Sequence, residues 1–163
     1  MIQRAGALQV RLRVAAPIDA HPITAVFGAP TVGAAIDDPD RLVILAEDDS
    51  GRPIGWAKIH RCPHDDEQAP AGHYLGGLGV IGAWRRRGIG TALTVPRMAW
   101  IRKRTDEIWC VINPRNEASL ALHTGLGFRE VGRGPRFHTT TFDGGVGVLL
   151  CAREVPPVDT LTP

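Results

Sequence analysis

A basic, glycine-containing loop near the middle of the chain has the residue types that bind phosphate. It reads Val80-Ile81-Gly82-Ala83-Trp84-Arg85-Arg86-Arg87-Gly88-Ile89-Gly90-Thr91 and lies between a predicted strand and a predicted helix. The first backbone amides of a helix have no acceptor within the helix, so they bind anions. Gly88 and Gly90 would let a phosphate come close to the backbone, and the arginines before them add positive charge. We therefore expect a phosphorylated cofactor here, the alternative being a solvated basic turn.

Two other phosphate-binding motifs fit this region less well. The run Gly77-Leu78-Gly79-Val80-Ile81-Gly82 has the GxGxxG spacing of dinucleotide-binding proteins. That motif needs a helix to open at its end, whereas here the predicted helix starts only at about Gly88. A Walker A loop needs Gly-Lys followed by Ser or Thr, and Gly90-Thr91 lacks the lysine. Neither motif is favoured.

A set of polar residues follows the next predicted strand. Asn116, Ser119 and His123 are three and four residues apart, so they share one face of a predicted helix over residues 114–126. Asn113 is a good N-cap for that helix, and Pro114 suits its first turn. The polar face is either a solvated surface or one wall of a ligand site, and the phosphate loop upstream favours the wall.

Together these two segments resemble the GCN5-related N-acetyltransferase (GNAT) superfamily. Arg85-x-x-Gly88-x-Gly90 is similar to the acyl-CoA pyrophosphate motif of that family, which is Q/R-x-x-G-x-G/A. The run Asn113-x-x-Asn116-x-x-Ser119-x-x-x-His123-x-x-x-Gly127-Phe128 resembles the strand–helix–strand unit that follows it in the family. The two elements occur in the expected order and cover about residues 75–132.

The resemblance implies that acetyl-CoA is the co-substrate. Its pantetheine arm would run beside the strand that ends at Val80, and the Val80 N–H would hold the negative charge that develops on the thioester oxygen. The amides of residues 86–91 would bind the pyrophosphate. The implied cofactor-binding residues are Leu78, Val80, Arg85, Arg86, Arg87, Gly88, Ile89, Gly90, Thr91, Asn113, Asn116 and Ser119.

The resemblance also raises the question of proton transfer. His123 stands where many family members have a tyrosine that protonates the departing thiolate. A histidine must be an imidazolium to do this, so His123 is a candidate general acid, a positioning residue or a bystander. His73 and Tyr74 are candidates for a general base or for ordering a water relay. His60 and His138 are further candidates, and a relay of waters alone is an equal alternative.

The implied activity is an acetyl-CoA-dependent N-acetyltransferase that moves an acyl group directly from the thioester to a primary amine. The acceptor would be a small molecule, a peptide N-terminus or a lysine, with no metal and no covalent intermediate. The alternative is a non-catalytic acyl-CoA-binding or sensory module. Acceptor recognition would use the variable segments 17–39, 62–72 and 133–145. Their acidic residues would suit a cationic amine, or would simply face water: Asp37, Asp38, Asp65, Asp66, Glu67 and Asp143.

Composition limits the other function classes. The chain has 163 residues, with 44 % hydrophobic and 22 % charged residues, as in soluble globular proteins. A net charge of +2 argues against a nucleic-acid or membrane-surface partner. The three cysteines, Cys62, Cys110 and Cys151, form no CxxC pair, which indicates free thiols rather than a zinc site or a disulfide framework. With no signal-peptide pattern and no apolar run of about 18 residues, we expect a cytoplasmic protein, with a homodimer as one option.

The elements that must position these residues follow from the hydrophobic pattern. We expect one domain over residues 1–154 and a flexible tail over 155–163. Glycines 76, 77 and 79 lie inside one predicted strand and indicate a bulge or a close approach by a ligand. The predicted strands are residues 8–14, 41–46, 54–60, 73–81, 107–112, 128–132 and 146–151, and the main helices are about 88–104 and 114–126. This order predicts an α/β (α+β) fold. The resemblance implies a mixed, mostly antiparallel sheet of six to seven strands, with splayed parallel central strands and flanking helices.

Overall fold

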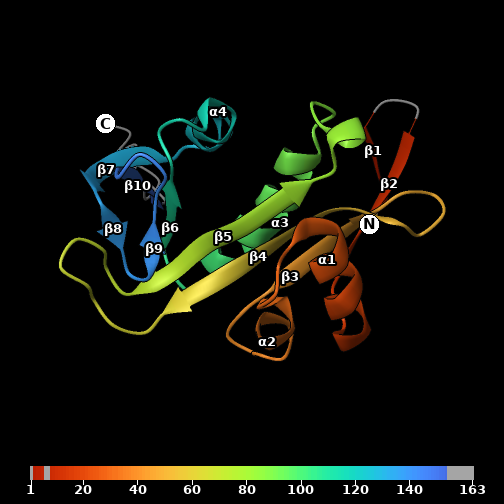
Figure 1. Ribbon diagram of the computed structural model, residues 1–163, viewed down its shortest axis with the longest axis horizontal. Helices are drawn as coiled ribbons and strands as arrows, with labels where there is room; N and C mark the ends of the chain where they lie inside the picture. The colour runs from red at the N-terminus through yellow and green to blue at the C-terminus, as the bar shows by residue number, and fades with distance from the viewer. Residues whose placement is uncertain (1, 6–7, 154–163) are drawn as a thin grey trace, which may run out of the picture.

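An eight-stranded sheet runs through the molecule in the order β1-β2-β3-β4-β5-β6-β10-β7 (Figure 1). The computed structural model describes residues 2–5 and 8–153. The predicted tail, residues 155–163, lies outside the described residues. The strands are β1 (Ile2–Ala5), β2 (Leu8–Val14), β3 (Val43–Glu47), β4 (Pro53–Cys62), β5 (Gly72–Val80), β6 (Glu107–Ile112), β7 (Arg129–Gly134), β8 (Arg136–Phe137), β9 (Thr140–Thr141) and β10 (Gly147–Arg153). The helices are η1 (Pro17–Asp19), α1 (Ala20–Phe27), α2 (Val32–Ile36), η2 (Gly82–Trp84), α3 (Ile89–Arg102) and α4 (Glu117–Gly125).

The sheet is antiparallel except between its central strands β5 and β6, which run parallel. This arrangement confirms the expected mixed sheet with flanking helices. The sheet is one strand larger than expected because β1 pairs with β2 at the edge. Four residues carry too little of an alternating pattern to be recognised as a strand from sequence.

Helices cover both faces of the sheet (Figure 1). Helices α1 and α2 pack on one face of β3 and β4, where Ile23 and Val32 meet Leu45 and Trp56. Helix α3 covers the opposite face, and its buried residues Leu93 and Ile101 belong to the core that includes β4. Because side chains alternate along a strand, Trp56 and Lys58 of β4 face the α1 side, whereas Ala57 and Ile59 face α3.

A bulge interrupts β5 in its glycine-rich half. Ala57 of β4 pairs with Leu78, but the next residue, Lys58, pairs with Gly76, so Gly77 is an extra residue in β5. Its φ of +41° lies in the left-handed region that favours glycine. The pairing of β5 with β6 covers only Tyr74 and Leu75 of β5, so the two strands diverge beyond that point. The divergence makes room for a cavity at this end of β5.

The start of α4 differs from the sequence prediction. The N-cap is Asn116, whose side chain accepts a hydrogen bond from the Ser119 amide at 3.1 Å. Asn113, the predicted N-cap, instead uses its side chain to accept from the Arg115 amide at 3.0 Å. The Asn116 amide donates to the Asn113 carbonyl, which closes a separate turn before the helix. The prediction that Asn113 caps the helix is therefore wrong, because this turn moves the N-cap from Asn113 to Asn116.

Candidate active site

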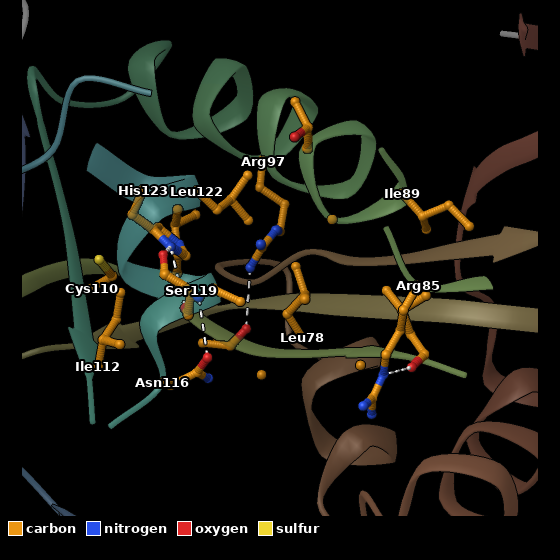
Figure 2. Close-up of a pocket in the computed structure, with 18 of the residues that line it drawn as sticks. Leu78, Arg85, Ile89, Arg97, Cys110, Ile112, Asn116, Ser119, Leu122 and His123 are labelled. Atoms are coloured by element: carbon orange, nitrogen blue, oxygen red, sulfur yellow. Dashed lines mark hydrogen bonds between the residues drawn. The ribbon is translucent and has the colours of Figure 1, made fainter. Parts of the chain in front are cut away.

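A cavity of about 980 Å³ opens where β5 and β6 diverge, between the start of α3 and the face of α4. Figure 2 shows His123 and Asn116 at one end of it, Arg85 and Ile89 at the other, and Arg97 between them. Most of the residues predicted for the site line this cavity: Leu78, Val80, Arg85, Arg86, Gly88, Ile89, Gly90, Thr91, Asn116, Ser119 and His123.

Two predicted cofactor contacts do not line the cavity. Arg87 turns onto the ring of Trp84, with its Cζ atom 5.4 Å from the ring centroid. Asn113 donates through its side-chain amide to the carbonyl of Asp143 at 2.9 Å. Both are neighbours of the cavity in sequence, but their side chains are engaged elsewhere.

The candidate bases His73 and Tyr74 lie at the other end of β5 from Val80. Tyr74 and Val80 are six residues apart, or about 20 Å of strand. His73 meets the ring of Trp100 edge-on, and the Tyr74 hydroxyl donates to the Pro70 carbonyl at 2.7 Å. The structure therefore does not bring either residue to the cavity. His60 and His138, the further candidates, do not line it either.

The end of the cavity that is predicted to bind phosphate is a helix N-terminus, preceded by two residues with left-handed backbone conformation. Arg86 has φ +60°, and the N-cap of α3, Gly88, has φ +79°. The Gly88 carbonyl accepts the first helical hydrogen bond, from the Ala92 amide at 2.9 Å. The three amides between them have no acceptor within the helix, and they belong to residues that line the cavity. This end has the donor chemistry of an anion site.

The backbone of Val80 faces the cavity because of the strand register. The Ile81 amide donates to the Ile54 carbonyl of β4 at 3.0 Å. In an antiparallel pair successive residues alternate in direction, so the N–H and C=O of Val80 point away from β4, toward the edge that β6 has left open. On that edge Arg85 Nε donates to the Val80 carbonyl at 3.1 Å (Figure 2). The Val80 N–H is thus a donor available to a ligand.

Arg97 is the largest fully buried side chain of the site and is only 1 % exposed. Its Nη1 atom donates to the carbonyls of Lys58 at 2.9 Å and Gly76 at 3.2 Å, one on each strand at the bulge. Nε donates to the Leu93 carbonyl, and Nη2 to the Thr94 hydroxyl, both at 3.0 Å. Burial lowers the pKa of Arg97 to about 10, which still leaves it charged at neutral pH.

Sequence reasoning missed Arg97, although a signal was present. The helix periodicity places one residue every fourth position on the same face. That series reads Ile89, Leu93, Arg97 and Ile101, so an arginine interrupts an otherwise apolar stripe. A charged residue in a core stripe needs internal hydrogen-bond partners, which indicates a structural or site role.

The hydrogen bonding and burial of His123 favour a neutral imidazole that is protonated on Nδ1. Its Nδ1 lies 2.8 Å from the Ser119 carbonyl oxygen, which can only accept, so Nδ1 carries the proton. Burial and the nearby charge of Arg97 lower the pKa of His123, although the hydrogen bond to Ser119 opposes this. At neutral pH Nε2 therefore holds a lone pair rather than a proton.

Cys110 also lines the cavity, but it is not an activated nucleophile. Burial raises its pKa, so the group is a protonated thiol at neutral pH. Cys62 and Cys151 are buried free thiols as well and lie outside the cavity.

A second hollow, of about 500 Å³, lies on the other face of β5, beside α1. It shares residues 77–80 and Arg85 with the cavity, so only the backbone of β5 separates the two. The glycines keep this strand thin, because a Cβ on Gly77 would lie 2.8 Å from Trp56 Cη2, and one on Gly79 would lie 2.8 Å from Trp56 Nε1. Among the segments expected to recognise the acceptor, only 17–39 reaches the hollow, through Val26 and Phe27.

Within residues 2–5 and 8–153, no group of three or more His, Cys, Asp or Glu side chains is arranged to hold a metal ion. In the same part of the chain, no helix is long and apolar enough to cross a membrane.

Comparison with solved structures shows the same fold in several proteins. The ribosomal-protein-S18-alanine N-acetyltransferase of Escherichia coli superposes with a TM-score of 0.69 at 16 % identity, over 94 % of this chain and 99 % of that one. A GCN5-related N-acetyltransferase from Kribbella flavida gives 0.68 at 21 % identity, over 89 % and 98 %. NAA60 of Arabidopsis thaliana, solved in complex with acetyl-CoA, gives 0.67 at 18 % identity, over 88 % and 98 %. At these low identities, the superpositions show that the proteins share a fold.

Comparison with curated protein sequences gave no match. The family model described as "Acetyltransferase (GNAT) family" matches residues 16–128, which is more than half of the chain and includes the loop at 85–90 and most of the cavity. The chain therefore belongs to the acetyltransferase (GNAT) family, and it is an acetyl-CoA-dependent N-acetyltransferase.

Proposed function

We propose that the protein transfers an acetyl group directly from acetyl-CoA to a primary amine, with both substrates bound at once on opposite sides of β5. The observation that carries this proposal is the pair of hollows that meet across residues 77–80. A module that only bound acyl-CoA would need one cavity and no second hollow. Direct transfer depends on holding the two reacting groups in one geometry, which a shared strand can do.

The residues of the larger cavity fit a thioester that carries a diphosphate. The free amides at the start of α3 and the exposed side chain of Arg86 would hold the diphosphate. The pantetheine arm would run along Leu78 and Val80, with Asn116 and Ser119 of α4 on its other side. When bound, acetyl-CoA supplies the activated acetyl group.

The Val80 N–H is the proposed oxyanion donor. It points to the open edge of β5 and uses no acceptor on β4. A fixed amide stabilises the charge that develops on the thioester oxygen without reorganising. Arg85, which holds the carbonyl of the same residue, helps to fix its orientation.

No side chain is assigned to protonate the departing thiolate. His123 carries its proton on Nδ1, which is bound to the Ser119 carbonyl, so it has none to donate from Nε2. Its lowered pKa keeps it neutral at the pH of the cell. We assign His123 a positioning role, in which it orients the first turn of α4 against the cavity.

No side chain is assigned as general base either. Apart from His123, no histidine and no carboxylate is found among the described residues that line the two hollows. The amine would lose its proton to water in the open hollow.

A covalent acetyl-enzyme is not part of the proposal, because Cys110 is held as a thiol. We place the protein in the cytoplasm, where buried free cysteines stay reduced.

The test begins with purified protein, acetyl-CoA and an amine panel of amino acids, polyamines, aminoglycosides and peptides, read by mass spectrometry. Val80→Pro then removes the N–H, and Val80→Ala keeps it as the matched control. We expect Val80→Pro to lower kcat by about 100-fold or more while acetyl-CoA still binds, and Val80→Ala to stay near wild type. Equal turnover of Val80→Pro and Val80→Ala would remove Val80 from the mechanism.

A further inference from the structure

The smaller hollow, which we call the acceptor hollow, combines apolar walls with a single charged side chain. The rings of Phe27 and Trp56 line it together with Val26 and Leu78. Among the described residues that line it, Arg85 is the only one that carries a charge. A ligand that matches this lining has an apolar part and an anionic group.

The guanidinium of Arg85 keeps hydrogen-bonding capacity for such a group. Its Nε donates to the Val80 carbonyl, and within the described chain the terminal Nη1 and Nη2 atoms have no protein partner. The side chain is exposed and lines both the cavity and the acceptor hollow. The two Nη atoms present a planar fork that matches a carboxylate.

A second cation lies next to the acceptor hollow. Lys58 is on the same face of β4 as Trp56, and its Cε atom lies 3.2 Å from where a Cβ on Gly77 would be. It is half-buried and makes no hydrogen bond or ion pair with the described residues. Burial and the charge of Arg41 lower the pKa of Lys58, as expected for a cation without a counter-ion.

The acidic residues that the sequence offered for a cationic amine do not reach the acceptor hollow. Asp38 forms an ion pair with Arg41 at 3.1 Å. Asp65 accepts from the Ala71 amide at 2.7 Å, and Asp66 accepts from the Glu67 and His138 amides. No carboxylate lines the hollow among the residues that the structure describes. A polycationic amine would therefore face uncompensated positive charge.

The position of Arg85 relative to Val80 indicates where the anionic group sits. Within one residue of a strand, the N–H and the C=O point to the same edge. Arg85 binds the C=O of the residue whose N–H we assign to the thioester oxygen. The guanidinium is thus next to the reacting carbon, within reach of a carboxylate on the carbon that bears the amine.

We propose that the acceptor is a free 2-amino acid with an apolar side chain. Its carboxylate would pair with Arg85, and its side chain would lie against Phe27 and Trp56. This inference rests on the proposed function. The amine nitrogen forms a bond to the thioester carbonyl carbon, the carbon–sulfur bond breaks, and the sulfur keeps the electron pair. The amine proton goes to water, and the products are an N-acetyl amino acid and coenzyme A.

The experiment compares matched acceptors with acetyl-CoA and wild-type protein, with kcat/KM measured by mass spectrometry. The set is leucine, phenylalanine and tryptophan, each with its amide and its decarboxylated amine, plus spermidine as the polycationic probe. A charge-assisted hydrogen bond changes affinity by roughly 10- to 150-fold, so we expect the best amino acid to exceed its amide and amine by at least tenfold. Spermidine should be poorer still.

Two variants identify the group that recognises the carboxylate. Arg85→Gln should reduce the preference for acid over amide to about one, whereas Lys103→Gln, an exposed position at the end of α3, should leave it unchanged. Acetyl-CoA affinity of each variant, measured by calorimetry, separates a loss of acceptor recognition from a loss of cofactor binding.

The outcomes separate this inference from the proposed function. Transfer to amides, amines or spermidine that equals or exceeds transfer to the acids overturns the inference and leaves the proposed function intact. Transfer to none of these acceptors while acetyl-CoA binds also overturns it. An acid preference that survives in Arg85→Gln overturns the role of Arg85. Failure to transfer to any amine of the wider panel would count against the proposed function itself.

Discussion

Arg97 donates a hydrogen bond to the Gly76 carbonyl at 3.2 Å, and thereby ties α3 to the strand that both substrates share. The same nitrogen also holds the Lys58 carbonyl, so one buried guanidinium joins β4 and β5 where their register shifts. The residues just after the bulge, including Val80, are the ones that line both hollows. The geometry of the proposed reaction centre at Val80 thus depends on the buried side chain of Arg97.

Arg97→Met should destabilise the protein and weaken acetyl-CoA binding. It removes the guanidinium donor from the part-buried carbonyls of Lys58 and Gly76, and a polar group left unsatisfied costs about 1–3 kcal/mol. We expect a loss of about 3 kcal/mol in the free energy of unfolding by urea titration. The control Lys103→Met, at the exposed end of the same helix, should change neither property. Wild-type stability and affinity in Arg97→Met would show that the bulge in β5 keeps its conformation without Arg97.

Gly77→Ala should disturb the bulge directly. Its new Cβ would lie 2.8 Å from Trp56 Cη2, at a φ of +41° that an alanine rarely adopts. We expect kcat/KM to fall by about tenfold or more, because β5 or Trp56 must shift. Gly132→Ala in β7 is the control, since nothing lies within 4 Å of its Cβ and its φ is ordinary. For both variants, kcat/KM is measured with one chosen amine, and stability is measured by thermal unfolding.

Gly88→Ala should weaken acetyl-CoA binding by more than its effect on stability explains. Gly88 has φ +79° with open space around its Cβ position, and Gly145 has φ +75° with equally open space. Both alanine variants should lose about 1 kcal/mol of stability from backbone strain. Only Gly88→Ala should raise the Kd for acetyl-CoA, as measured by calorimetry, because it reorients the amides at the start of α3. An equal effect of the two variants on Kd would argue against this anion site.

The neutral state of His123 predicts how stability depends on pH. The unfolded chain protonates this residue near its ordinary pKa of about 6.5, whereas the folded protein does so only at lower pH. Stability from this group is therefore full above pH 6.5 and decreases as the pH falls. We expect His123→Gln to lose less stability than wild type between pH 7.5 and 5.5 in urea titrations. His60 and His73, whose pKa values burial also lowers, contribute equally to both proteins.

Turnover gives a separate test of His123. Because it has no proton to donate from Nε2, His123→Gln should keep the shape of the pH profile of kcat, with at most a uniform decrease. Instead, kcat should increase with pH around the pKa of the acceptor amine. Two acceptors of different basicity would therefore give profiles displaced along the pH axis. Loss of a descending limb in His123→Gln would restore the general-acid role.

The sequence by itself determined the family, the order of the elements and most of the cavity wall. The loop at 85–90 and the polar face of α4 are defined by short-range spacing, and helix and strand periodicity alone puts such residues side by side. Residues 86–91 need only the start of one helix to present their amides. For this reason Gly88, Gly90, Asn116 and Ser119 were found without any knowledge of tertiary contacts.

Only the tertiary structure decided which chemistry faces the two hollows. The register of β4 against β5, shifted by one residue at Gly77, sets the direction of the Val80 amide. The divergence of β5 from β6 leaves His73 and Tyr74 outside the cavity, although they share a strand with Val80. Arg97 reaches the bulge from α3, a separate element of the chain. The carboxylate of Asp65 accepts a hydrogen bond from a backbone amide of its own loop. These relationships rest on contacts between distant segments, and a one-residue shift in pairing reverses which groups face a ligand.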